Sequence, residues 1–215
     1  MLLTELQILP PISTFTDGMR NGGLIIEAFE NYQKKSLRNR FFLSSSNGRI
    51  SISIPLQKGK SNQLKIKDVR VSYDENWIKN IHHTLTTVLG RSAFFEHYFD
   101  SVMGIFYSHI ETLWDLNRAL LQWAVEAGEI SLKIDYTESY IRKDSYKHKD
   151  FRNKPLSFYH NPTSNNYIEY DQIFMMEHGF IRNLSILDLI MNRGPETGLL
   201  INNHVNNSYL NKMNN

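Results

Sequence analysis

Charged and polar side chains occur in this sequence where the surrounding residues predict a buried, apolar position. Glu27 interrupts the apolar run from Leu24 to Phe29, and a carboxylate removed from water needs a cationic partner. Arg38 and Arg40 follow in the next segment, and guanidinium groups bind carboxylates and phosphates with planar pairs of donors. We therefore expect these three charged groups to meet in one polar cleft. A purely structural ion pair is the alternative interpretation.

Two predicted helices carry a polar side chain on or beside their apolar face. In the helix expected over 77–89, His82 lies at the edge of the arc formed by the apolar side chains. An imidazole there is either an acid–base or anion-binding group that titrates near neutral pH, or a core histidine with one backbone partner. In the helix expected over 115–127, Asn117 falls within the apolar stripe. Because a buried amide requires partners, Asn117 is either an internal brace or part of a pocket wall.

The segment 184–192 has a single polar stripe. Ser185, Asp188 and Asn192 share one helical face, and the other positions from 184 to 191 are apolar, so the stripe is expected to line a wet cavity. The same spacing of Ser185 and Asp188 also fits the capping motif of a helix start, and this alternative stays open. Since His82 and Asp188 are both exceptions on otherwise apolar helices, we expect them to face one cavity.

Positive charge is concentrated in one part of the chain. Residues 34–70 contain ten basic side chains and one acidic side chain, a local balance of +9 inside a protein whose formal net charge is +2. Such a field attracts anions, and we expect Lys35 to join Arg38 and Arg40 in binding phosphate. The alternative for the lysines is a solvated edge that protects the fold from aggregation.

Several classes of protein are excluded by the composition. The chain has no cysteine, which excludes disulfides, thiol nucleophiles, iron–sulfur clusters and cysteine-based zinc sites. Its eight histidines lack metal-ligand spacing, so no metal site is predicted, and the common phosphate-binding, nucleotide-binding, hydrolase and zinc-protease motifs are absent. There is no run of 18 apolar residues and no secretory signal pattern, so we expect a cytoplasmic protein without a membrane span.

The order of patterns predicts an α/β fold, with α+β as the alternative. We expect one domain over 1–201 and a flexible, asparagine-rich tail over 202–215. A central mixed sheet should carry a β-hairpin near 41–56, where Asn47-Gly48 predicts a type I′ turn. Strand patterns are expected at 6–9, 24–29, 66–73 and 130–136, and the packing helices lie within 77–127 and 170–192. The long aperiodic segment 139–166 is expected to be a mobile lid over the cleft.

These segments together resemble the WbqC-like protein family over about residues 5–200. The resemblance is carried by the order and spacing of five blocks, which include Glu27 to Arg40, Ile54-Pro55-Leu56 with Lys58-Gly59, Ile66 to Val69, Trp77 to Tyr98 with Ile81-His82, and His178 to Pro195. Ala93 and Leu37 depart from the family pattern, and the chain after 201 has no counterpart in it.

The resemblance implies a cytoplasmic bacterial enzyme of surface-polysaccharide biosynthesis, for which transfer of an acyl or aminoacyl group to a nucleotide-linked amino sugar has been suggested. In that function Arg38, Arg40 and Lys35 would hold phosphates, and His82 would take the proton from the attacking amine. Asp188 or Glu27 would orient His82 or bind sugar hydroxyls, and neutral hydrogen bonds to substrate would come from Asn39, Asn117, Tyr32 and Ser185. No cofactor is identified; the co-substrate would be an activated acyl donor or a nucleotide-sugar.

The alternative is a non-catalytic module that binds nucleotide-sugars, partner proteins or nucleic acid. A nucleic-acid footprint would be exposed, whereas the polar positions above are predicted to be buried in a nearly neutral protein. We therefore expect a small, phosphate-bearing partner rather than nucleic acid. The sequence does not predict an oligomeric state.

Overall fold

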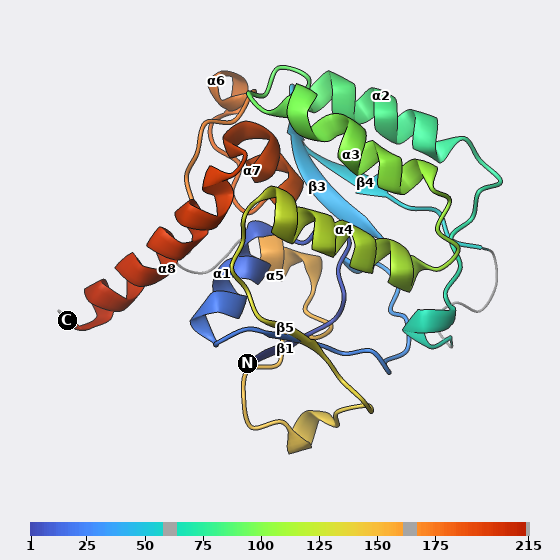
Figure 1. Cartoon of the computed structure of the whole chain (residues 1–215), viewed down its shortest axis with the longest axis vertical. Coiled ribbons are helices and arrows are strands. Elements are labelled where there is room, and N and C mark those ends of the chain that lie inside the picture. The colour runs from blue at the N-terminus through green and yellow to red at the C-terminus, as the bar shows by residue number, and fades with distance from the viewer. Residues whose placement is uncertain (58–63, 161–166, 214–215) are drawn as a thin grey trace.

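The computed structural model describes residues 1–57, 64–160 and 167–213, which form two small sheets flanked by helices (Figure 1). The strands are β1 (Leu2–Thr4), β2 (Leu24–Ile26), β3 (Arg40–Ser45), β4 (Gly48–Ser53) and β5 (Ile134–Tyr136). The α-helices are α1 (Ile12–Arg20), α2 (Trp77–Leu89), α3 (Phe95–Tyr107), α4 (Leu113–Ala127), α5 (Leu156–His160), α6 (Met175–His178), α7 (Ile186–Arg193) and α8 (Glu196–Met213). Short 3₁₀ helices occur at η2 (Ile66–Asp68) and η3 (Lys143–Ser145). The α/β class is therefore confirmed.

The first sheet is parallel and has the order β1-β2-β5. Its register pairs Thr4 with Ile26, and Ile26 with Tyr136. Helix α1 connects β1 to β2, and the longer connection from β2 to β5 contains α2, α3 and α4. Because all three strands run in the same direction, their carboxyl ends meet at one edge.

The second sheet is the predicted hairpin, formed by β3 and β4. The strands form two separate sheets rather than one mixed sheet. The turn also differs from the type I′ prediction. Ser45 pairs with Gly48, so the loop residues are Ser46 and Asn47, and neither has the positive φ that a type I′ turn requires. The positive φ, of 90°, is found at Gly48, directly after the loop. Glycine is needed there because this φ suits residues without a Cβ atom.

Helices α2, α3 and α4 pack side by side next to the hairpin (Figure 1). The apolar stripe predicted in the third of these helices is confirmed, since Leu116, Leu120 and Ala124 are fully buried. None of the helices among the described residues is both long and apolar enough to cross a membrane.

Three predicted segments have a different structure. The strand expected over 6–9 is irregular backbone between β1 and α1. The strand expected over 66–73 is replaced by η2 and by backbone hydrogen bonds from Val71 to Glu111 and from Leu113 to Val69. The asparagine-rich tail expected to fray from residue 202 is helical to Met213. Tertiary packing explains this helix, because α8 packs against α1 and buries Ile201 and Val205. Packing of this kind stabilises a helix whose sequence pattern does not predict one.

Candidate functional site

The carboxyl edge of the parallel sheet carries a polar residue directly after each strand. Glu5 follows β1, Glu27 follows β2 and Thr137 follows β5, and all three are buried. Backbone hydrogen bonds from Glu27 to Thr4 and from Thr137 to Ile26 continue the ladder past the strand ends. In open α/β sheets, ligands bind outside this edge. The carboxyl edge is therefore the expected location of a ligand-binding site.

The Glu27 carboxylate is a hub that joins β2 to the segment after β5. Its Oε1 accepts hydrogen bonds from the Phe29 amide at 3.0 Å and from the Thr137 hydroxyl at 2.8 Å. Its Oε2 accepts from the Ile141 amide at 3.0 Å and from Arg152 Nη1 at 2.8 Å. The side chain is fully buried. Four donors occupy the carboxylate, so its role in this geometry is to hold the site together.

Arg152 is the cation that Glu27 requires, and it lies outside the basic segment. Its guanidinium group also binds Asp150, with Nη2 at 2.7 Å from Oδ2, and donates to the Ile141 carbonyl at 2.8 Å. Burial would raise the pKa of Asp150, but hydrogen bonds and charge from Arg152 hold it below its usual value. The Arg152 guanidinium lies 5.3 Å from the centroid of the Tyr140 ring, which it supports as a cation–π partner. The pairing of Glu27 with Arg38 or Arg40 predicted from the sequence is thereby corrected.

Arg38 binds two other carboxylates at the same edge. Its Nε and Nη2 donate to Glu30 at 2.8 and 2.5 Å, and Nη2 also donates to Asn153 Oδ1 at 2.8 Å and lies 3.8 Å from Glu5. Burial would lower the pKa of Arg38, but Glu30 and Glu5 raise it above its usual value. The guanidinium group is fully buried, so it supports Glu30 from behind rather than forming an open phosphate clamp.

Glu30 opens onto a cleft with a volume of about 320 Å³. The cleft is lined by Phe29, Glu30, Asn31, Gln33, Lys65, Tyr140, Arg152 and Asn153. Burial raises the pKa of Glu30, and this effect outweighs the opposing hydrogen bond and charge of Arg38. A carboxyl group whose pKa is shifted toward neutrality beside a cleft is suited to exchange a proton with a ligand.

The segment that follows β5 supplies one side of this cleft. Asn153 has a φ of 58°, a left-handed conformation that asparagine tolerates better than most residues. Its amide donates to Glu5 Oε2 at 2.8 Å. Backbone hydrogen bonds from Leu3 to Lys149 and from Phe151 to Leu3 fix the segment to β1. The predicted lid, residues 139–166, thus contributes Tyr140, Arg152 and Asn153 to the lining of the cleft. Residues 161–166 lie outside the described residues. The mobility of this segment stays a prediction.

The sequence profile of the WbqC-like protein family matches residues 7–153 and 135–199. The chain belongs to this family. Comparison with curated proteins and with solved structures gives no significant match. The matched residues of this WbqC-like chain include Glu27, Glu30, Arg38 and Arg152, so most of the cleft and its supporting charges lie within the family's extent.

The other residues predicted to bind substrate around Arg38 lie behind the cleft or away from it. The Tyr32 hydroxyl donates to Asn39 Oδ1 at 3.0 Å, and Asn39 Nδ2 donates to the Ile54 carbonyl at 2.9 Å. Arg40 is the half-buried first residue of β3, and Lys35 is exposed. None of these four predicted residues lines the cleft of about 320 Å³.

Asn117 of the WbqC-like chain is an internal brace. It is fully buried on α4, and its Nδ2 donates to the Arg38 carbonyl at 2.7 Å and to the Leu6 carbonyl at 3.5 Å. Of the two interpretations left open by the sequence, the geometry corresponds to the brace. Asn117 therefore holds the backbone of Arg38 in position through this hydrogen bond.

His82 and Asp188 lie in different surroundings. The half-buried His82 ring packs edge-on against Phe99, with ring centroids 5.0 Å apart. The centroid of the Tyr107 ring lies 6.5 Å from that of His82. The buried Asp188 carboxylate accepts hydrogen bonds from Tyr170 at 2.8 Å and from Asn192 at 3.3 Å. Burial raises the pKa of Asp188 to about 6. Neither side chain lines the carboxyl-edge cleft, and their contacts do not support a shared cavity.

Ser185 caps a helix, as the second interpretation of its spacing predicted. Its hydroxyl accepts a hydrogen bond from the Leu187 amide at 3.2 Å and donates to the Leu9 carbonyl at 2.8 Å. Both bonds are buried. The side chain thus satisfies the start of α7 rather than lining the carboxyl-edge cleft.

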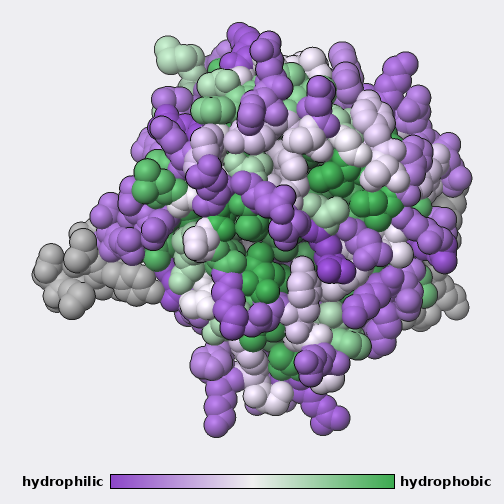
Figure 2. Space-filling view, viewed as in Figure 1, coloured by the Kyte–Doolittle hydropathy of each residue, from purple (hydrophilic) through white to green (hydrophobic). Residues whose placement is uncertain are grey.

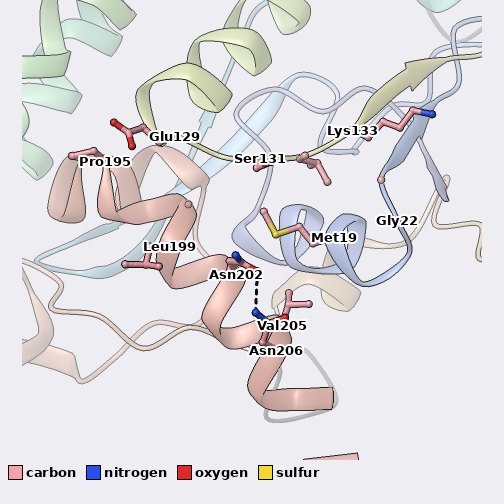
Figure 3. A pocket seen from close by; sticks show the side chains of 13 residues that line it. Met19, Gly22, Glu129, Ser131, Lys133, Pro195, Leu199, Asn202, Val205 and Asn206 are labelled. Atoms are coloured by element: carbon pink, nitrogen blue, oxygen red, sulfur yellow. Dashed lines mark hydrogen bonds between the residues drawn. The ribbon is translucent and has the colours of Figure 1, made fainter. Parts of the chain in front are cut away.

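A larger cavity, of about 620 Å³, lies between the end of α1, residues 129–133 and α8 (Figure 3). Apolar side chains gather near the middle of the face drawn in Figure 2. The ionisable side chains in its lining, Glu129 and Lys133, are exposed, and Asn206 donates to Asn202 at 3.2 Å. Buried charge is thus found at the smaller cleft, which is the candidate site. Among residues 1–57, 64–160 and 167–213, no three side chains of metal-binding type form a cluster.

The sequence interpretation missed Glu30, Tyr140, Arg152 and Asn153. One signal was available for the edge itself, although not for these four residues: a polar residue stands directly after each of the three strands, and the carboxyl edge of parallel strands is where α/β proteins bind ligands. Tyr140, Arg152 and Asn153 come from an aperiodic segment, where pattern carries no information about contacts.

Proposed function

We propose that this WbqC-like protein is a cytoplasmic enzyme of bacterial surface-polysaccharide biosynthesis that transfers an acyl or aminoacyl group to the amine of a nucleotide-linked amino sugar. The observation that carries the proposal is Glu30, a nearly buried carboxylate that opens onto the cleft at the carboxyl edge of the parallel sheet. Its raised pKa supports a role as the base. The family resemblance supports the class of substrate.

The proposed reaction needs one proton acceptor. The amine nitrogen attacks the acyl carbon of an activated donor, a carbon–nitrogen bond forms, and the leaving group departs with its electron pair. The proton released from nitrogen passes to Glu30. A glutamate with a raised pKa is a stronger base than an ordinary one. In this proposal Glu30 takes the place that the sequence interpretation gave to His82.

Neutral donors around the cleft would stabilise the charge that develops on the acyl oxygen. Asn31, Gln33 and Asn153 line the cleft and have amide groups that can donate hydrogen bonds. Arg38 is a positioning residue: two of its nitrogens bind Glu30 and direct the carboxylate.

The test combines ligand binding with turnover. Nucleoside-diphosphate amino sugars and acyl donors are screened by thermal shift, where a ligand at 100 times its dissociation constant stabilises by about 2.7 kcal/mol. Pairs that stabilise are incubated with the enzyme, and acylated product is measured by mass spectrometry. Glu30→Gln should lower kcat at least about 100-fold, the usual lower range for loss of a general base. The exposed Glu138→Gln is the matched control and should leave kcat unchanged.

Two results would contradict the proposal. Full turnover by a folded Glu30→Gln variant would remove Glu30 from the chemistry. Saturable binding of a nucleotide-sugar without any transfer would instead favour the non-catalytic binding module. Since Glu30→Gln leaves Arg38 with less countercharge, circular dichroism of the variant must show that it is folded, and Glu30→Asp, which keeps the charge, should retain partial activity.

A further inference from the structure

A row of aromatic rings and cations continues the cleft across the surface. It begins at Phe29, which lines the cleft, and Lys67 Nζ lies 4.4 Å from the centroid of this ring and 5.5 Å from that of Trp114. Trp114 packs edge-on against Tyr136 at 5.8 Å, and the Arg118 guanidinium lies 5.3 Å from the Tyr136 ring. We call these five residues the cation–aromatic row.

Two lysines stand where the row leaves the cleft. Lys65 lines the cleft and approaches the Phe29 carbonyl at 3.5 Å, and Lys67 follows it on η2. Both side chains are exposed, whereas Ile66 between them is fully buried and anchors the pair. Within the described part of the chain neither lysine forms an ion pair with a carboxylate. Their charges are therefore available to an anionic ligand.

The far end of the row offers an aromatic face. Tyr136 is 39% exposed at the end of β5, while Trp114 beside it is buried and holds it in place. Arg118, on the other side, is paired with Asp115 at 3.9 Å. A fixed, half-exposed ring of this kind provides a stacking surface for a planar base.

The size of the cleft and the order of these groups match the parts of a nucleotide-sugar. A cleft of about 320 Å³ lies at the lower end of the usual range for ligand pockets, about 300–1,000 Å³, so it has room for a sugar ring. The lysines come next along the row and Tyr136 comes last. Sugar, diphosphate and base follow one another in the same order.

We propose that the cation–aromatic row, together with Lys65, is the nucleoside-diphosphate subsite of this protein. Lys65 and Lys67 bind the phosphates, and the base stacks on Tyr136. The assignment rests on the proposed function, whose substrate carries a nucleotide, and it moves phosphate binding from the buried Arg38 to two exposed lysines.

Binding of uridine diphosphate and adenosine diphosphate, measured by calorimetry with the unmodified chain, tests the subsite. Tyr136→Leu should weaken binding by about 5-fold or more, the loss expected for one stacked base. Lys67→Met should weaken it as well and should reduce its dependence on salt, because screening acts on the charge that the variant lacks. Tyr107→Leu and Lys79→Met, exposed residues on α3 and α2, are the matched controls and should bind as the parent does.

The outcomes separate this inference from the proposed function. Unchanged affinity in both Tyr136→Leu and Lys67→Met, or no binding of either diphosphate at millimolar concentration, would overturn the subsite even if an amino sugar lacking a nucleotide is acylated. Tighter binding of a thymidine decamer than of the diphosphates would also overturn it and would identify a nucleic-acid surface. Row-dependent diphosphate binding without any acyl transfer would support the subsite and contradict the proposed reaction.

Discussion

Replacing Arg152 with methionine should destabilise the protein strongly. The substitution keeps an unbranched side chain but removes the charge and every donor. Glu27, which is fully buried, would retain its bonds from neutral donors and lose the cation that pairs with it at 2.8 Å. Asp150 would lose its bidentate partner at the same time. Leaving a buried carboxylate uncompensated in this way costs about 3–5 kcal/mol.

That cost is large against the total stability of a domain, which is typically about 5–15 kcal/mol. Urea unfolding at pH 7, with linear extrapolation to zero denaturant, measures it directly. The control is Arg70→Met: Arg70 pairs with Glu111 on the surface, where the side chains are 53% and 67% exposed, and such pairs contribute only about 0–1 kcal/mol.

A double-mutant cycle with Glu27→Gln assigns the loss to charge. If the unpaired Glu27 carboxylate causes the damage, the double variant will be less destabilised than the sum of the two single variants, by about 0.5–3 kcal/mol. The reasoning is refuted if Arg152→Met loses no more stability than Arg70→Met, or if the two single effects simply add.

Two further predictions concern residues outside the cleft. The pKa of about 6 for Asp188 in the folded protein lies above its unfolded value of 3.8, so folding binds a proton and the wild type loses stability as pH rises between these values. The stability of Asp188→Asn relative to wild type should therefore rise by about 2–3 kcal/mol between pH 4 and pH 7, as measured by urea unfolding, and a constant difference would disprove the shift. His82→Gln should leave ligand binding and turnover unchanged and lower the melting temperature by about 2–4 °C through loss of its ring contact with Phe99; lost turnover in a stable variant would return His82 to the active site.

Local patterns in the sequence were sufficient for most helices. The helix predicted over 77–89 is α2 with the same bounds, and α4 buries the predicted stripe. The hairpin position was also predictable, although its turn type was not. Helical periodicity, glycine ends and turn residues act within a few positions of one another, so they can be recognised without knowledge of the fold.

Burial of the key charges was only partly predictable. The apolar residues around Glu27 indicated that it is buried and needs a cation, and this is what the structure contains. Glu30 carried no such signal, because it lies in a short segment without periodicity between β2 and β3. The sequence therefore predicted a charged cluster near the right segment but assigned Glu27 the wrong cationic partner.

Only the tertiary structure decided which groups meet. Arg152 reaches Glu27 across 125 positions of the chain because β5 pairs with β2, and the segment after β5 then turns back along the carboxyl edge. Lys67, Trp114 and Tyr136 come together in the same way from η2, α4 and β5. Strand order and the paths of connecting segments are set by the packing of the whole core. Periodicity records which face of an element is buried, but it holds no information about what that face is buried against.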